Sequence, residues 1–213
     1  MDDNFNPNPN HPLLERYARK RDPQLLKPLR KEFRVILNVQ ALQSITDAIY
    51  VRENCNLLVF GVGNDSGLWM AANRNGGKTV FLENHEGWLE TVKKRYPAID
   101  ARIVSYKTEL RDWRKLLNRP EDLMMDDLDD EVRNTNWDVI LVDAPMGFKP
   151  HHPGRMQSIY TARQLAKENS HVYIDDCLRP VEWIYSNRFF GDTQLVERLG
   201  LFKSVWHYRV PEA

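Results

Sequence analysis

The sequence has few cysteines and no excess of charge of either sign. Its 213 residues contain only Cys55 and Cys177, which cannot form a framework of disulfide bridges, so we interpret both as buried free thiols. Thirty basic residues balance thirty acidic ones, which excludes the strong overall field that recruits nucleic acid or an anionic membrane surface. We therefore expect no nucleic-acid partner.

Long hydrophobic runs are also missing. No apolar stretch approaches the roughly 20 residues that a helix needs to cross a bilayer, and the N-terminus lacks the apolar segment of a signal peptide. We expect no membrane span in this chain, which as given is expected to be soluble and cytoplasmic. A chain from which an anchor had been trimmed would look the same.

The composition predicts one globular domain of ordinary size, with 42% hydrophobic and 28% charged residues. Residues 1–31 are predicted to form a flexible N-terminal arm, rich in Asn and Pro, followed by short helical pieces that Pro23 and Pro28 limit in length. Residues 32–213 are predicted to form the main domain.

Apolar runs that suit strands alternate with amphipathic stretches that suit helices. Predicted strands cover residues 57–60, 79–82, 102–105, 137–142, 171–174, 193–199 and 202–208, and predicted helices cover residues 32–51, 85–96, 110–117, 156–167 and 179–189. The acidic residues 118–136 are interpreted as a solvated insertion. The alternation predicts an α/β, Rossmann-like fold with a mainly parallel seven-stranded sheet. Its closing antiparallel hairpin is typical of methyltransferases that use S-adenosylmethionine (SAM).

A glycine-containing turn follows the first predicted strand. Gly61 and Gly63 come directly after the apolar run LLVF, and Glu83 ends the next strand twenty positions after Gly63. Glycines let the backbone approach a ligand closely, and an acidic side chain about 20 residues later can bind two ribose hydroxyls. The pattern predicts a nucleotide-type cofactor held by this turn, including Asn64 and Ser66, and by Glu83. The alternative is an ordinary strand-to-helix turn.

Ser66 favours SAM over a nicotinamide dinucleotide as this cofactor. In the dinucleotide-binding pattern the sixth position is a glycine, and the motif as a whole cradles a pyrophosphate. SAM has no pyrophosphate, so a turn with only two of the three glycines suits it better.

Acidic residues recur at the carboxyl ends of the later strands, as Asp143, Asp175 and Asp176. In a methyltransferase sheet the fourth strand lies beside the first, which would place Asp143 against the cofactor's methyl group. Methyl transfer to an alcohol requires a base, and a carboxylate near the acceptor oxygen can serve. Alternatively, the three aspartates could bind a divalent metal that lowers the pKa of an acceptor hydroxyl, or could cap the following helices.

Polar side chains are concentrated in the loop of residues 147–155. We predict that Lys149 and Arg155 bind an acidic substrate, Arg155 through two parallel hydrogen bonds to a carboxylate. His151 and His152 are further predicted substrate contacts, with a rigid loop carrying solvated histidines as the alternative. The aromatic side chains that could stack on a sugar ring, if they do not pack in the core, are Phe148, Trp69, Trp88 and Trp183.

Four ordered segments resemble one known family. They read LVFGVGNDSGLW, TVFLE, WDVILVDAP and PGRMQSIY, and the resemblance runs from about Leu42 to the C-terminus. The chain resembles the glucuronoxylan 4-O-methyltransferase family of plant cell-wall polysaccharide biosynthesis. This resemblance implies methyl transfer from SAM to the 4-hydroxyl of glucuronic acid in a saccharide. It assigns the two glycines and Glu83 to the cofactor, and Asp143 with the Pro153–Arg155 loop to the reaction site.

The resemblance also refines two other expectations. The family more often has His-Asp where this chain has Asp175-Asp176, so Asp176 is the better supported of the two. Plant members usually carry an N-terminal Golgi anchor, so the Golgi lumen is the expected location if such an anchor has been removed. The alternatives are a metal-dependent O-methyltransferase of small molecules and a non-catalytic relative that supports polysaccharide assembly.

Overall fold

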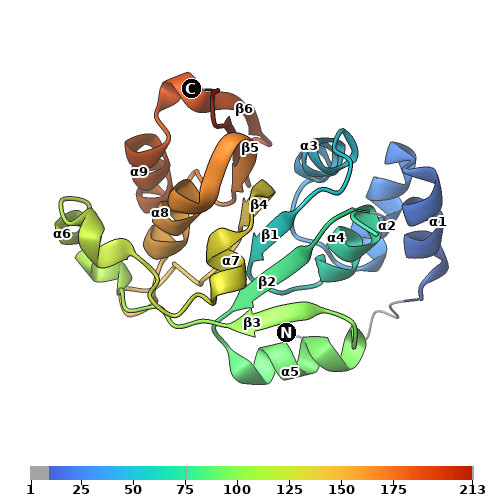
Figure 1. The fold of residues 1–213 in the computed structure, drawn as a ribbon, viewed down its shortest axis with the longest axis horizontal. Helices are drawn as coiled ribbons and strands as arrows, with labels where there is room; N and C mark the ends of the chain where they lie inside the picture. The colour runs from blue at the N-terminus through green and yellow to red at the C-terminus, as the bar shows by residue number, and fades with distance from the viewer. Residues whose placement is uncertain (1–9, 75, 213) are drawn as a thin grey trace.

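A seven-stranded sheet with helices on both faces forms the centre of this computed structural model (Figure 1). The structure describes residues 10–74 and 76–212, so most of the predicted flexible arm lies outside the described residues. The strands are β1 Leu57–Phe60, β2 Thr79–Glu83, β3 Asp100–Ile103, β4 Trp137–Val142, β5 Ala166–Ile174, β6 Leu195–Leu199 and β7 Val205–Arg209. The α-helices are α1 Pro12–Lys20, α2 Leu26–Glu32, α3 Val39–Tyr50, α4 Ser66–Ala72, α5 Glu86–Arg95, α6 Trp113–Leu116, α7 Asp130–Asn134, α8 Met156–Leu165 and α9 Pro180–Phe189. Short 3-10 helices are η1 Pro23–Leu25, η2 Leu110–Asp112, η3 Pro120–Leu123 and η4 Asp192–Gln194.

The strand order is β3-β2-β1-β4-β5-β7-β6. Strands β1 to β5 pair in parallel, whereas β7 is antiparallel to both β5 and β6. Since β1 pairs directly with β4, the carboxyl ends of the strands that precede the glycine turn and Asp143 are neighbours. The predicted Rossmann-like methyltransferase fold and its C-terminal antiparallel hairpin are confirmed.

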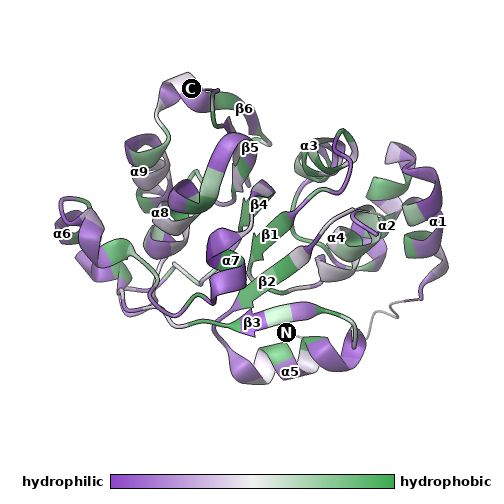
Figure 2. Ribbon diagram, viewed as in Figure 1, coloured by the Kyte–Doolittle hydropathy of each residue, from purple (hydrophilic) through white to green (hydrophobic). Residues whose placement is uncertain are grey.

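Alternating side chains of the central strands fill two separate cores. On β1, Leu57 and Val59 pack with α1 to α5, whereas Leu58 and Phe60 contribute to the core beneath α7, α8 and α9. Both sets are fully or almost fully buried, as expected for parallel strands covered on both faces. Figure 2 shows apolar central strands and helices that carry both polar and apolar residues. The apolar runs that marked these strands in the sequence follow from this double burial.

The predicted helix of residues 32–51 begins seven residues later than expected. Val35 and Leu37 are buried while Ile36 is 57% exposed, an alternation typical of extended chain rather than of a helix. The side chain of Asn38 accepts a hydrogen bond from the amide of Ala41 and caps α3 at this point. The prediction was wrong here because alternate apolar residues were assigned to a helical period.

The acidic segment of residues 118–136 is more than a solvated insertion. Leu123, Met125, Leu128 and Val132 are buried in the core beneath α8. Several of its carboxylates form ion pairs with basic side chains of the sheet edge, including Asp129 and Glu131 with Arg102 and Glu131 with Lys78. The interpretation followed the acidic composition and overlooked these four apolar residues, which anchor the segment.

The other strand and helix boundaries differ from the predictions by smaller amounts. Strand β3 begins two residues earlier than predicted, and β5 begins at Ala166 with a register shift against β4. The predicted helix of residues 110–117 is divided into η2 and α6.

The N-terminal helices pack against the same core as α3. Leu14, Tyr17, Leu26 and Leu29 are buried there. Within the described part of the chain, no helix combines the length and hydropathy needed to cross a membrane.

Candidate functional site

The glycine turn lies at the junction of β1, β2 and β4. Gly61 has a φ of +108°, and a Cβ atom built on it would lie 2.9 Å from the Cβ of Ala144. Both the backbone conformation and the lack of space therefore require glycine here. The close approach holds the turn against the segment that follows β4.

Replacing Gly61 by alanine is expected to lower the free energy of unfolding by about 1–3 kcal/mol, through strain at positive φ and overpacking against Ala144. Urea unfolding would measure the loss. Gly191→Ala is the matched control, because Gly191 has a φ of +71° but open space around the added Cβ. Equal losses in the two variants would show that contact with Ala144 contributes nothing.

Glu83 supports the glycine turn from the carboxyl end of β2. Its carboxylate, only 6% exposed, accepts hydrogen bonds from the amides of Val62, Asn84 and His85 at 3.2, 2.7 and 2.8 Å. A carboxylate offers about four lone-pair positions, so these contacts leave room for one further hydroxyl donor. The buried Ser66 hydroxyl accepts from the amide of Gly63 at 2.9 Å. This geometry fits a ribose bound beside a closely approaching backbone.

The predicted cofactor residues Asn64 and Ser66 follow Gly63 in the chain and have different surroundings. Asn64 is half-buried in the glycine turn, whereas Ser66 is fully buried and closes it. Ser66 therefore holds the conformation of the turn in this structure rather than facing a ligand.

Arg155 lies among the three aspartates singled out in the sequence. Its Nη2 atom is 2.9 Å from Asp143 Oδ1 and 3.0 Å from Asp176 Oδ2, and its Nη1 atom is 3.6 Å from Asp175 Oδ2. It also donates to the main-chain oxygen of Asp143 at 2.9 Å. Arg155 is only 5% exposed. The guanidinium therefore ties together the segments that follow β4 and β5.

The arrangement does not fit the hypothesis of a metal held by Asp143, Asp175 and Asp176. One oxygen of each aspartate faces the Arg155 guanidinium, which lies between them. Across residues 10–74 and 76–212, no group of three or more His, Cys, Asp or Glu side chains is arranged to hold a metal ion.

Two acidic groups of this site, Asp143 and Asp65, have raised pKa values. Burial raises the pKa of Asp143 well above its usual value, the nearby Arg155 guanidinium opposes this, and the charges of Asp175 and Asp65 add to it. Burial and the charge of Asp175 also raise the pKa of Asp65. Asp143 thus combines a raised proton affinity with partial exposure, 32% of its side chain. Both properties suit a general base.

Three charged residues of this cluster were missed in the sequence. They are Asp65, Arg179 and Glu182. Arg179 Nη2 lies 2.8 Å from Asp176 Oδ2, and its Nη1 lies 3.8 Å from a carboxylate oxygen of Glu182, which is 1% exposed. Asp65 could have been noticed from its place in the glycine turn. Glu182 could have been noticed because it lies in the first turn of the helix that follows Asp175-Asp176.

The loop of residues 147–155 separates its predicted substrate residues. Lys149 and His151 are exposed, whereas His152 is buried and its Nδ1 faces the amide of Phe148 at 3.4 Å. Burial, with the charges of His151 and Lys149, lowers the pKa of His152. Lys149 and His151 remain available to a ligand in this structure, while Arg155 is already engaged by carboxylates of the protein.

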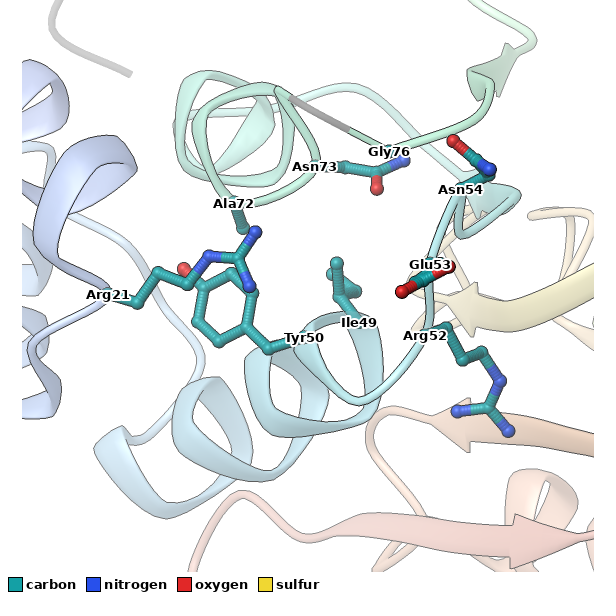
Figure 3. A pocket seen from close by; sticks show the side chains of 9 residues that line it. All are labelled: Arg21, Ile49, Tyr50, Arg52, Glu53, Asn54, Ala72, Asn73 and Gly76. Carbon is teal, nitrogen blue, oxygen red and sulfur yellow. The ribbon is translucent and has the colours of Figure 1, made fainter.

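Two cavities lie away from these strand ends. One of about 300 Å³ lies between α1, α3 and α4, where the Arg21 guanidinium stacks over the ring of Tyr50 at 4.5 Å (Figure 3). A more open groove of about 790 Å³ runs between α3 and strands β5 to β7. Neither is lined by the glycine turn, Glu83 or Asp143.

Known proteins resemble this chain in sequence and in fold. A family model described as IRX15/IRX15L/GXM matches residues 40–122 and 119–208. The chain is 38% identical over 180 residues to glucuronoxylan 4-O-methyltransferase 2 of Arabidopsis thaliana, with 75% of this chain and 61% of that protein covered. It is 34% identical over 201 residues to arabinogalactan O-methyltransferase 2 of Arabidopsis thaliana, with 82% and 68% covered.

A solved structure supports the fold assignment. Precorrin-6y C5,15-methyltransferase from Geobacter metallireducens superposes with a TM-score of 0.52 at 13% identity, covering 84% of this chain and 91% of that one. The chain spans about three fifths of the length of the glucuronoxylan relative. The family resemblance seen in the four sequence segments is confirmed, and the family model matches most of the chain. The chain belongs to the IRX15/IRX15L/GXM family.

Proposed function

We propose that this protein is a SAM-dependent O-methyltransferase whose acceptor is the 4-hydroxyl of a glucuronic acid residue in a saccharide. The observation that carries the proposal is the meeting of the glycine turn, Glu83 and Asp143 at neighbouring strand ends of a methyltransferase-type sheet. Relatives named for O-methylation of glucuronoxylan and arabinogalactan support both the reaction and the class of acceptor.

In this proposal one set of residues binds the cofactor and another transfers the proton. SAM, when bound, supplies an electrophilic methyl group on a sulfonium sulfur that leaves as a neutral thioether. Glu83 accepts a hydrogen bond from one ribose hydroxyl, and Gly61 and Gly63 let the backbone approach the nucleoside. Asp143 takes the proton of the acceptor hydroxyl while the oxygen of that hydroxyl acts as the nucleophile towards the methyl group. The Arg155 guanidinium orients the Asp143 carboxylate for this transfer.

Calorimetry and methyl transfer test the proposal. SAM and NAD are titrated into the protein in separate experiments. The protein is then incubated with labelled SAM and glucuronoxylan oligosaccharides. We expect SAM binding, no NAD binding, and label on the 4-oxygen of glucuronic acid. NAD binding without SAM binding would contradict the cofactor assignment. Label on a different oxygen would support O-methyl transfer but contradict the 4-hydroxyl as the acceptor.

Replacing Glu83 by alanine is expected to weaken SAM binding by about 1.5–3 kcal/mol, roughly 10- to 150-fold, since the ribose loses a hydrogen bond to a charged group. Calorimetric titration measures the affinity. Asp100→Ala, at an exposed carboxylate of β3, is the control and should bind SAM normally. Unchanged affinity in Glu83→Ala would remove Glu83 from the cofactor site.

A non-catalytic saccharide-binding relative is the second candidate. The 2.9 Å ion pair between Arg155 and Asp143 favours it, because an engaged carboxylate is a weaker base. This candidate predicts no label transfer in the same assay, together with heat of binding when the glucuronoxylan oligosaccharide is titrated into the protein.

A further inference from the structure

Asp143, Asp175 and Asp176, which surround Arg155, form an acidic cluster, and four large apolar side chains are exposed in the segments that follow these aspartates. Met146 and Phe148, in the loop after β4, are 56% and 62% exposed, and Leu178 and Trp183, after β5, are 57% and 48% exposed. We call these four residues the apolar rim. Exposed apolar groups that gather in one place mark binding surfaces more often than singly scattered ones do.

Contacts between the two segments bring the rim together. A Cβ built on Gly147 would lie 3.0 Å from Glu182 Oε1 and 3.2 Å from the Cα of Gly154. Phe148 and Trp183 each follow one member of the Gly147–Glu182 contact by one residue, and consecutive Cα atoms lie about 3.8 Å apart. The backbone segments that carry Phe148 and Trp183 therefore lie close together, and both side chains are exposed.

The structure separates these two aromatics from the others that could stack on a sugar. Trp69 is fully buried, and Trp88 is half-buried with its indole N–H donating to the main-chain oxygen of Val62 at 2.7 Å. Phe148 contacts the His152 ring edge-to-face at 4.3 Å, which holds its ring in place while most of it remains exposed. Of the four aromatic residues that could stack on a sugar, only Phe148 and Trp183 are both exposed and close to the acidic cluster.

Basic groups border the same surface. Lys149 is exposed directly after Phe148. Arg179, 37% exposed, lies between Leu178 and Trp183 in the chain and contacts Asp176 at 2.8 Å. Since Asp176 and Glu182 already engage Arg179, it is Lys149 that favours an occupant with a negative charge as well as apolar faces.

We propose that the apolar rim is the acceptor-binding surface for the neutral sugar residues that flank the uronic acid of a polysaccharide. One face of a pyranose ring presents C–H groups, which pack against the face of an aromatic ring. The uronate carboxylate meets the exposed Lys149, while its sugar hydroxyl reaches Asp143. This inference rests on the proposed function and extends it from a single sugar to an extended glycan.

Steady-state kinetics with acceptors of two lengths test the proposal. Phe148→Ala and Trp183→Ala are compared with the wild type on a glucuronoxylan oligosaccharide and on the methyl glycoside of glucuronic acid. We expect KM for the oligosaccharide to rise about tenfold, the loss of one aromatic stacking contact. The kcat, the KM for SAM and the KM for the monosaccharide should stay unchanged. Trp183→Phe should restore most of the affinity.

Phe202→Ala is the matched control. Phe202 is 92% exposed on the turn between β6 and β7, so its removal should leave every constant unchanged. Unchanged KM for the oligosaccharide in both rim variants would overturn the proposal. So would a dimer of the wild type that dissociates in the rim variants, since the occupant would then be a second copy of the chain.

Direct binding separates this inference from the proposed function. If the wild type transfers no methyl group, the proposed function fails, and calorimetric titration with the same oligosaccharide still tests the rim. Binding that both rim variants weaken would support the rim as a glycan-binding surface. No binding to the wild type would overturn it.

Discussion

Replacing Asp143 by asparagine is expected to lower kcat by about 10²- to 10⁴-fold, the usual contribution of a positioned general base. Asparagine has nearly the same shape and can still accept the hydrogen bond from Arg155, but it cannot take a proton from the acceptor. SAM affinity, measured by calorimetry, should stay close to that of the wild type. The rate is measured as label transferred to a glucuronic acid acceptor under saturating SAM.

The pH dependence of kcat gives an independent check on this role. A base works only when it is ionised, so the wild-type rate should rise with pH through the pKa of Asp143, which burial raises well above its usual value. This rise should disappear in Asp143→Asn. Asp138→Asn, at the opposite end of β4 and paired with Arg52, is the control and should retain both rate and pH profile. Full activity in Asp143→Asn would contradict the role of Asp143 as the general base.

The fold could be predicted from the sequence because its signals are local. The runs that form β1, β2 and β4 are apolar throughout since both faces of these strands are buried, and the glycine turn and Glu83 follow them at fixed spacing. Local signals were weaker where tertiary contacts decide the structure. Residues 33–38 form a turn followed by an irregular segment rather than a helix, and the acidic residues 118–136 include buried apolar side chains.

The candidate site was predicted in composition but not in its internal pairing. The sequence indicated that Asp143, Asp175 and Asp176 would end neighbouring strands, and the structure places them together. From the sequence alone, it could not be decided whether Arg155 would face a substrate or those aspartates. That outcome depends on how the loop of residues 147–155 folds back, which no residue spacing encodes. The assignment of catalytic and substrate roles stays a prediction.

Replacing Arg155 by methionine is expected to lower the free energy of unfolding by about 3–5 kcal/mol at neutral pH, because it leaves buried carboxylates without their cationic partner. Three aspartates lie within 3.6 Å of the guanidinium, and Arg155 is 5% exposed. Urea unfolding measures the loss. Arg111→Met, which breaks an ion pair between exposed Arg111 and Glu109, should cost at most about 1 kcal/mol.

The loss in Arg155→Met should shrink as the pH falls. Asp143 has a raised pKa in the folded protein, so its proton binds more tightly there than in the unfolded chain, and stability falls as pH rises from the unfolded pKa of about 3.9 towards the folded value. Arg155 opposes this rise in the pKa of Asp143. Its removal therefore lowers the stability more at neutral pH, where Asp143 would be ionised, than at low pH, where Asp143 is protonated. Asp143→Asn removes one of the stranded charges and should recover part of the loss in the double variant. A deficit that is constant with pH and additive in the double variant would mean that Arg155 stabilises the fold by packing, not by charge.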